Sequence, residues 1–364
     1  MLIRDVVSLL EQLAPPSYQE SYDNTGLIVG SFENPLKGIL LSIDVTPDVV
    51  EEAYSRGANM IIAHHPLIFS GLKKITGKTY TEKAIITAVK KDIAIYAAHT
   101  NLDNVLGGVN SKIGEKLDLK GLRFLVPAHD YLVKLAVFAP HAQAEAVRNA
   151  MFDAGAGHIG DYDSCSYNSQ GVGSFRGNEN TNPFVGEKGM LHIEPETKIE
   201  VIVPKVSLPN VLKAMLVVHP YEEVAYDIYP LLNEFQGAGT GMIGYFEQPL
   251  TEMEFLNRLK TVFSAKHIRH TQLLNIPVRK VAYCGGSGAQ LLDFAIAAGA
   301  NVFVSADFKY HQFFDANKNI LIADIGHFES EQFTVDIFYD FLLKKLSNFA
   351  VFKSEIITNP INYL

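Results

Sequence analysis

Hydrophobic and polar positions follow two alternating periods along the first third of the chain. The apolar run "GILLSIDVT" predicts a buried strand, and "PDVVEEAYSRG" predicts a helix that begins at Pro47 and ends at Gly57. The runs "ANMIIAHH" and "DIAIYAAH" predict two more strands, with helices expected at about 79–91 and 108–117. This alternation favours an α/β fold with a mainly parallel sheet that is covered by helices on both faces.

The same pattern returns near the end of the chain. "VRKVAYCGG", "ANVFVSAD" and "NILIADIG" predict strands, and helices are expected in "SGAQLLDFAIAAG", at 308–317 and in "FTVDIFYDFLLKKL". "GANMIIAHH" (57–65) and "GANVFVSAD" (299–307) both follow a predicted helix, and their alignment places His65 opposite Asp307. We interpret the two regions as pseudo-repeated βα halves around one cleft, although Gly-Ala-Asn is also a common link between a helix and a strand.

Residues 128–237 have a different character. "YLVKLAVFAP" predicts a strand and "HAQAEAVRNAMFDAGA" a helix, and a Gly- and Ser-rich region then precedes a strand and a helix in "TKIEVIVPKVSLPNVLKAMLVVHP". "VAYDIYPL" predicts a last strand, which completes a βαββαβ order typical of a ferredoxin-like α+β domain. We therefore predict a discontinuous α/β domain at 1–127 and 238–364, interrupted by an inserted domain at 128–237.

Composition and charge exclude several classes of function. The 364 residues are 48% hydrophobic and carry a net charge of −9, which is unfavourable for general nucleic-acid binding and for binding anionic membrane surfaces. The N-terminal "MLIRDVVSLLEQL" predicts an amphipathic helix and no signal peptide, and no apolar run approaches the ~20 residues of a membrane span. Only two cysteines are present, so we expect no disulfide framework and a cytoplasmic location.

Three polar segments follow predicted strands: "AHHP" (63–66), "HTNLD" (99–103) and "GHFESE" (326–331). Ligands of open parallel sheets bind at the carboxyl ends of strands, so all three segments occupy suitable positions. His327 and Glu331 are four residues apart and share one helical face. Taken alone, these two residues could equally serve the helix N-terminus, and Asp103 could be a helix N-cap.

Joint placement favours a metal centre. The candidate ligands are His64, His65, Asp103, His327 and Glu331, which offer three imidazoles and two carboxylates. These are too many ligands for one open catalytic ion, but they suit two ions about 3.5–4 Å apart that share a carboxylate. Adjacent strand residues point to opposite faces, so we expect His64 and His65 to bind different ions, with Glu331 between them. The nitrogen and oxygen donors suit zinc, iron, manganese or cobalt.

Other residues could surround this centre. We predict that His99 transfers protons. Asp307, Lys309 and His311 in "ADFKYHQ" could bind substrate or orient ligands, or form a solvated helical turn. Gly286 in "CGGSG" could present a backbone N–H to a substrate phosphate, although a tight left-handed turn explains the glycines as well.

Five separated motifs together resemble the Nif-three-like family, whose members are often named GTP cyclohydrolase 1 type 2 homologues. They are "DNTGLIVG" (23–30), "AHHPLIF" (63–69), "HTNLDNVLGGVN" (99–110), "CGGSG" and "GHFESE". The resemblance implies two divalent ions per subunit, zinc or alternatively iron or manganese, held by the five ligands above with Glu331 bridging. It also implies a toroidal homohexamer, and the insert resembles the PII-like domain of longer family members.

These observations lead to two functional hypotheses. The first is a cytoplasmic metal-dependent hydrolase of a nucleotide-like or phosphorylated small molecule. Its GTP version would hydrolyse the purine C8 position and release formate. The alternative is a non-catalytic, metal-binding regulatory or scaffold hexamer whose insert senses a small ligand.

Overall fold

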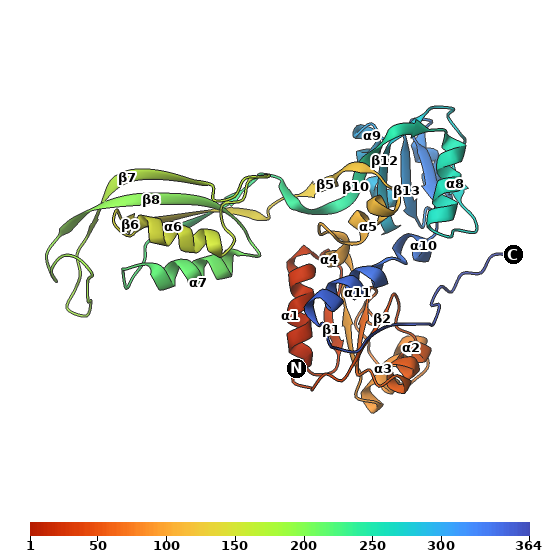
Figure 1. Cartoon of the computed structure of the whole chain (residues 1–364), viewed down its shortest axis with the longest axis horizontal. Coiled ribbons are helices and arrows are strands. Elements are labelled where there is room, and N and C mark those ends of the chain that lie inside the picture. The colour runs from red at the N-terminus through yellow and green to blue at the C-terminus, as the bar shows by residue number, and fades with distance from the viewer. The chain divides into compact units, whose positions relative to one another are not determined.

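The chain divides into two compact units. The computed structural model describes residues 1–364, of which Met1–Val126 and Gly237–Leu364 form unit 1 and Pro127–Gln236 forms unit 2 (Figure 1). Each unit has a hydrophobic core of its own.

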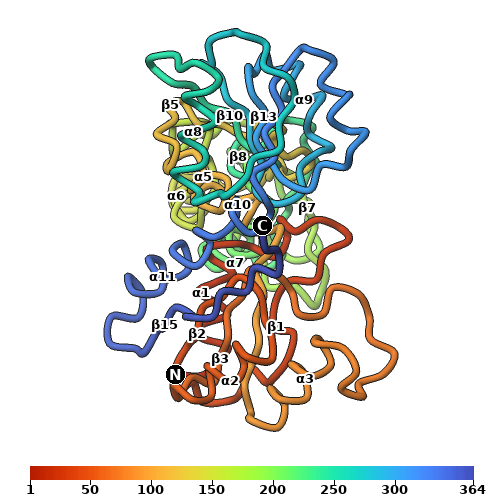
Figure 2. Tube along the Cα trace, turned by 90° about the vertical axis from the view of Figure 1, so that its right-hand side faces the viewer, coloured from red at the N-terminus to blue at the C-terminus, as the bar shows by residue number.

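The first sheet of unit 1 contains the strands of the N-terminal half. Its order is β1 (Gly26–Val29), β4 (Ala94–Ala97), β3 (Met60–Ala63), β2 (Ile39–Ser42) and β15 (Val351–Lys353). All neighbouring strands are parallel except β1, which pairs antiparallel with β4. Figure 2 shows the C-terminal β15 running beside β2.

Helices cover both faces of this sheet. The apolar sides of α2 (Pro47–Ser55) and α3 (Tyr80–Lys90) pack on one face. Those of α1 (Ile3–Leu13) and α11 (Thr334–Lys345) pack in the core on the other face. Every residue of β2, β3 and β4 is buried, because helices cover both faces of the sheet.

The second sheet of unit 1 contains the strands of the C-terminal half. Its order is β11 (Arg269–His270), β14 (Leu321–Asp324), β13 (Val302–Ala306), β12 (Val278–Ser287), β10 (Phe235–Leu250) and β5 (Lys120–Ala128). Strands β12, β13 and β14 are parallel, whereas β11 and β10 pair antiparallel with their neighbours β14 and β12.

Our expectation of one mainly parallel sheet is therefore wrong, because the two halves form separate sheets. Strand β2 pairs with β15, and β12 pairs with β10. These neighbours occupy the edges at which the two parallel groups could have joined. One hydrophobic core instead contains residues of both sheets, such as Met60 and Val302.

Shorter helices complete unit 1. They are α4 (Thr100–Asp103), α5 (Val109–Lys116), α8 (Glu252–Val262), α9 (Leu292–Ala297) and α10 (His327–Glu331), with 3-10 turns η1 (Pro16–Tyr18), η2 (Ala289–Leu291) and η3 (Tyr310–Ala316). The helix expected at 308–317 is the 3-10 turn η3, which ends at Asn317 in a left-handed conformation.

Unit 2 has the predicted βαββαβ order. Its elements are β6 (Leu132–Pro140), α6 (Ala144–Asp153), β7 (Ser166–Phe175), β8 (His192–Pro204), α7 (Leu208–Val218) and β9 (Tyr226–Leu231). The antiparallel sheet has the order β7-β8-β6-β9, which is the ferredoxin-like topology. Both helices pack on one face of the sheet. The likeness of this unit to PII proteins stays a prediction.

The two Gly-Ala-Asn triplets have the same local conformation. Gly57 and Gly299 have φ angles of +74° and +70°, which favour glycine. The side-chain oxygen of Asn59 accepts a hydrogen bond from the Lys37 amide at 2.7 Å. That of Asn301 accepts from two successive amides of β12, at 3.0 and 2.8 Å. Each asparagine thus ties its link to the start of a neighbouring strand, while the pseudo-repeat itself stays an interpretation.

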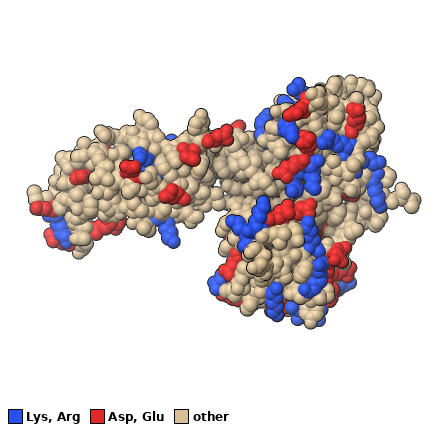
Figure 3. Space-filling model, viewed as in Figure 1, with Lys and Arg blue, Asp and Glu red and all other residues tan.

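The surface carries both signs of charge. On the face seen in Figure 3, Lys and Arg side chains of unit 1 are interspersed with Asp and Glu side chains. No helix of the structure combines the length and the apolar character that crossing a membrane requires.

We expect Asn59→Ala to destabilise unit 1 by about 1–3 kcal/mol, since the buried Asn59 side chain bonds the backbone at both Lys37 and Pro35. Urea unfolding followed by circular dichroism measures this change. Asn257→Ala, at an exposed position of α8, is the matched control and should change stability by less than about 0.5 kcal/mol. Equal stability of the two variants would contradict the role of Asn59.

Candidate metal centre

The candidate ligands come together where strands of both sheets of unit 1 end. His64 and His65 follow β3, and Asp103 is the last residue of α4, which follows β4. His327 and Glu331 are the first and last residues of α10, which follows β14. Because Asp103 ends its helix, the alternative that it is an N-cap is wrong.

Glu331 lies at the centre of the cluster. Its side chain is 3% exposed, and its Oε1 lies 3.7 Å from Nε2 of His64. Its Oε2 lies 3.0 Å from Nε2 of His65 and 3.1 Å from Nε2 of His327. Asp103 Oδ1 lies 3.6 Å from Nε2 of His64. Two groups of donor atoms therefore share the two oxygens of one carboxylate.

The spacing of these atoms suits metal ligands. Ligand atoms about 2.0–2.1 Å from a tetrahedral zinc ion lie about 3.3 Å apart. The Nε2 atoms of His65 and His327 are 3.3 Å apart, which matches that spacing. One ligand atom from each of His65, His327 and Glu331 lies within 4.8 Å of the others, and the same holds for His64, His65 and His99.

The Nδ1 atom of each histidine in the cluster has a partner of its own. Those of His65, His99 and His327 bond Asp44, Asp23 and Asp307 at 2.7, 2.8 and 2.6 Å, and that of His64 bonds the carbonyl oxygen of Ala98 at 3.0 Å. Such partners fix the orientation of metal-binding imidazoles and leave Nε2 for the ion. Asp307 was expected to bind substrate or to orient ligands, and it bonds the ring of His327, a candidate ligand.

Sequence reasoning assigned no role to Asp23 or Asp44. Asp23 begins the motif "DNTGLIVG", which supported the family resemblance, and Asp44 follows β2. Their positions after "SYQESY" and in "SIDVT" carry no spacing signal toward a histidine. Asp23 is 76 residues from His99, so only the fold shows the pairing.

Some buried polar atoms of the cluster have no hydrogen-bond partner within the chain. The Ala98 carbonyl only accepts hydrogen bonds, so His64 donates from Nδ1. Burial lowers the pKa of His64, and the neutral ring then presents a lone pair at Nε2. This atom and Asp103 Oδ1 are buried without a hydrogen-bond partner. Each unsatisfied atom costs about 1–3 kcal/mol, whereas one divalent cation can contact both of them.

The nearby carboxylates also shift the pKa values of His65 and His327. Although burial acts in the opposite direction, neighbouring carboxylates raise the pKa of His65 to about 10 and that of His327 to about 11. Burial and the nearby Glu331 raise the pKa of Asp103 well above its usual range. The site thus holds positive charge strongly, either as protons or as metal ions.

Gly286 has a steric role in this centre. Its φ angle is +60°, and a Cβ atom there would lie 2.2 Å from Glu331 Oε1. Its amide donates to Ser330 Oγ, and the amide of Gly285 donates to Asn110 Oδ1, both at 2.9 Å. Both amides already have partners within the chain, so the structure gives no support to phosphate binding at Gly286, and the left-handed turn explains the glycine.

His311 does not reach the centre. Its ring packs against the rings of Tyr310 and Phe314, at centroid distances of 5.2 and 6.2 Å, and it does not line the adjacent cavity. The predicted substrate role of His311 is therefore not supported, because η3 holds its ring with these neighbours.

A cavity of about 460 Å³ opens beside the metal ligands. Its lining contains carboxylates, two histidines and uncharged side chains, but no Lys or Arg. The lining residues are Glu20, Tyr22, His99, Thr100, Asp103, Asn104, Asn110, Val126, Thr240, Cys284, Gly285, Ser287, Gln290, Leu291, Phe294, His327 and Glu331. Burial raises the pKa of the Cys284 thiol, so this cysteine is not a nucleophile.

Comparisons with known proteins cover nearly the whole chain. The model of a family described as Duf34/NIF3 (NGG1p interacting factor 3) matches residues 1–360. A Halalkalibacterium halodurans protein named "GTP cyclohydrolase 1 type 2 homolog" is 43% identical over 324 residues, 88% of this chain and 87% of the relative. A Bacillus subtilis protein of the same name is 37% identical over 371 residues, 99% of this chain and 98% of the relative.

A solved structure shares the fold. The crystal structure of a Bacillus cereus protein related to NIF3 superposes with a TM-score of 0.89 at 38% identity, and covers 100% of this chain and 99% of that one. Together these matches confirm the resemblance that the five motifs indicate.

We expect Asp307→Asn to weaken zinc binding about 10–100-fold, because His327 loses the carboxylate that holds its Nδ1. Competition with a chromophoric chelator measures the affinity. Asp315→Asn changes an exposed aspartate of η3, outside the cluster, and should bind zinc as the wild type does. If Asp307→Asn kept wild-type affinity, Asp307 would not support a metal ligand.

Proposed function

The chain belongs to the Duf34/NIF3 (NGG1p interacting factor 3) family, and on this premise we propose that it is a cytoplasmic, metal-dependent hydrolase. The observation that carries the proposal is the buried Glu331 carboxylate, whose two oxygens face different groups of donor atoms. One divalent ion would lie near His64 and Asp103, and a second near His65 and His327. Zinc fits the nitrogen and oxygen donors, and iron and manganese are the alternatives.

Bound ions of this kind polarise a substrate, and they lower the pKa of a bound water molecule toward neutral pH. The residues around them supply the other requirements of hydrolysis. His99 lines the cavity, and its Nδ1 bonds Asp23 at 2.8 Å, which leaves Nε2 to accept or release a proton. Because its ligand atom also groups with those of His64 and His65, His99 serves either as this proton carrier or as a further ligand.

The cavity lining favours an uncharged reacting group. It contains Glu20 and Asp103 but no Lys or Arg to bind a phosphate directly. Asn104 donates to Glu20 Oε1 at 3.1 Å, so the carboxylate is held in place and can accept N–H groups of a ring. Of the two predicted substrate classes, we therefore favour the nucleotide-like one, with a ring C–N bond as the bond cleaved. The names of the relatives make GTP the first substrate to test.

We expect zinc-loaded protein to release formate from GTP, and Glu331→Gln to lose at least about 100-fold in rate, since its neutral side chain cannot compensate two cations. Formate is measured by a coupled dehydrogenase assay. Glu247→Gln, at an exposed position of β10, is the matched control and should keep full activity.

Three results would decide against this proposal. Absence of formate while a known cyclohydrolase works in the same buffer would exclude GTP as the substrate. Absence of hydrolysis across nucleotides, cyclic amides and phosphoesters would exclude the hydrolase. If Glu331→Gln lost its metal while the assembly and its cellular role persisted, the alternative of a non-catalytic scaffold protein would replace the hydrolase proposal.

We also propose the toroidal homohexamer that the family resemblance implies. Light scattering of the metal-loaded protein should give six times the mass of the single chain. A monomer or dimer at micromolar concentration would contradict this assembly.

A further inference from the structure

Unit 2 contains a cavity that the metal centre does not use. Its volume is about 640 Å³, within the range of about 300–1,000 Å³ that is typical of small-molecule sites. The lining comes from β7, from the segment after it up to Phe184, and from Phe138, Glu196, Lys198, residues 221–223 and Ala225. The strand pairing places Phe138, Glu196 and Gly171 on one face of the sheet, and the buried valines that contact α6 and α7 on the other.

Glycines make the cavity hollow. Gly171 pairs directly with Glu196, and a Cβ atom built on Gly171 would meet nothing within 4 Å. A Cβ atom on Gly173 would lie 2.3 Å from Glu196 Oε2, so the carboxylate occupies the space that a side chain would need. Glycine weakens a strand interior, and there it often marks the close approach of a ligand.

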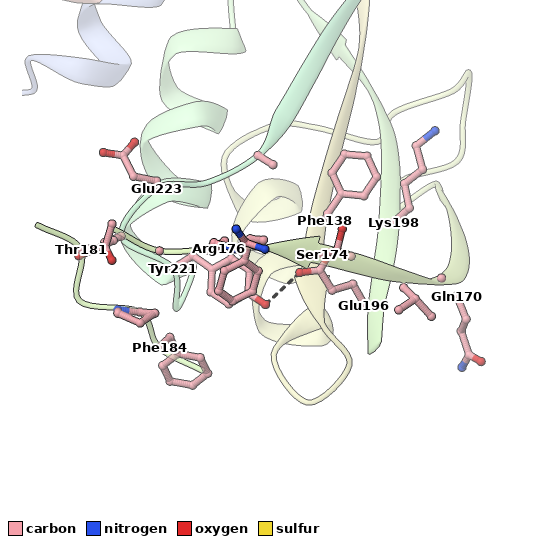
Figure 4. A pocket seen from close by; sticks show the side chains of 18 of the residues that line it. Phe138, Gln170, Ser174, Arg176, Thr181, Phe184, Glu196, Lys198, Tyr221 and Glu223 are labelled. Carbon is pink, nitrogen blue, oxygen red and sulfur yellow. Dashed lines mark hydrogen bonds between the residues drawn. The ribbon is translucent and has the colours of Figure 1, made fainter. Parts of the chain in front are cut away.

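Aromatic rings surround this hollow. Tyr221 lies 6.0 Å from Phe175 and 6.3 Å from Phe184, measured between ring centroids. Figure 4 shows Tyr221 directed toward Glu196, with Phe184 on the neighbouring segment. Phe184 is 52% exposed, so part of its ring can contact a ligand in the cavity. These rings favour a flat, unsaturated ligand.

Glu196 and Arg176 define the polar groups of such a ligand. Glu196 is 9% exposed, and its Oε1 accepts a hydrogen bond from Tyr221 Oη at 2.9 Å. Burial and this bond raise the pKa of Tyr221, so the phenol stays protonated and donates to Glu196. Oε2 has no donor within the chain. Lys198 is paired with Glu200 at 3.3 Å, and its ammonium group points away from Glu196 in Figure 4. Arg176, by contrast, lines the cavity without forming an ion pair.

We propose that this cavity binds an amino-substituted planar heterocycle that carries an anionic group, as a guanine nucleotide does. The Glu196 carboxylate accepts N–H groups from the edge of the ring, the aromatic side chains contact its faces, and Arg176 pairs with the anionic group. Oε2 of Glu196 can accept one N–H of the ring edge, and Oε1, which already accepts from Tyr221, has a second lone pair for the adjacent amino group. Adenine lacks the ring N–H. The proposal does not rest on the hydrolase activity, because all of these residues belong to unit 2.

Calorimetric titration with GMP tests the proposal, with AMP, guanosine and ribose 5-phosphate as comparison ligands. The whole chain carrying Glu331→Gln is titrated in a metal-free buffer with a chelator, so that binding through metal ions is excluded. GMP should bind at least about 10-fold more tightly than AMP and ribose 5-phosphate, since a charged hydrogen bond contributes about 1.5–3 kcal/mol. Equal binding of all four ligands, or none, overturns the proposal.

Variants locate the ligand. Gly171→Leu fills open space on the strand, so it should keep the thermal stability of unit 2 and abolish GMP binding. Glu196→Gln should weaken GMP at least about 10-fold, whereas Glu200→Gln on the same strand face should not. Arg176→Ala should weaken GMP but leave guanosine unchanged, and Arg148→Ala on α6 is its control.

Three outcomes overturn this placement. Undiminished GMP binding by folded Gly171→Leu moves the ligand elsewhere. Equal losses for GMP and guanosine in Arg176→Ala remove the anionic contact. A changed oligomeric state of Gly171→Leu in light scattering makes the hollow a contact between copies of the chain.

Discussion

The burial of Glu331 is the constraint on which the centre of unit 1 depends. A carboxylate at 3% exposure needs compensating positive charge, because desolvation disfavours its ionised form. The surrounding imidazoles hold the pKa of Glu331 well below its usual range although burial acts against them. His65 and His327, whose pKa values are raised, satisfy part of this demand, whereas burial lowers the pKa of His64 and favours its neutral ring. The lone pair of His64 and the buried Asp103 therefore remain available to the metal ions that we propose.

Other residues of unit 1 fix the orientation of the side chains around Glu331. Asp44 and Asp307 each hold one imidazole from outside, so that Nε2 of His65 and of His327 points inward. Both sheets deliver ligands from the ends of buried strands, where the backbone is held by its neighbours on either side. A glycine at position 286 then leaves room for the carboxylate itself. Removal of any one of these supports would leave the ligands present but misdirected.

Local patterns predicted those parts of the site that depend on neighbours in sequence. The spacing of His327 and Glu331 predicts their contact, because a helical turn alone brings them together. The expectation that His64 and His65 bind different ions stays a prediction, because their ligand atoms also lie within 4.8 Å of each other. Strand β3 ends at Ala63, so the alternation of side chains along a strand no longer applies to them. Their rings, 4.9 Å apart, are instead directed by Ala98 and Asp44.

Features that depend on contacts between residues distant in sequence could not be predicted. Alternating strands and helices were readable, but the division into two sheets depends on β15 and β10, whose partners lie far away in sequence. The roles of Asp23 and Asp44 were hidden for the same reason. Unit 2 was more predictable in topology, since its βαββαβ order follows from successive elements. Its cavity was not, because a gap left by Gly171 becomes visible only when the strand pairing is known.

The two cavities make opposite demands on the charge of a ligand. The cavity of unit 1 has carboxylates and no Lys or Arg, so an anionic group enters it favourably only through bound cations. The cavity of unit 2 has a cationic side chain of its own, Arg176, beside the buried Glu196 carboxylate. A ring with a phosphate therefore finds complementary groups in unit 2 without any metal. Binding there and turnover at the metal centre are separable properties, and a ligand of unit 2 need not be a substrate of unit 1.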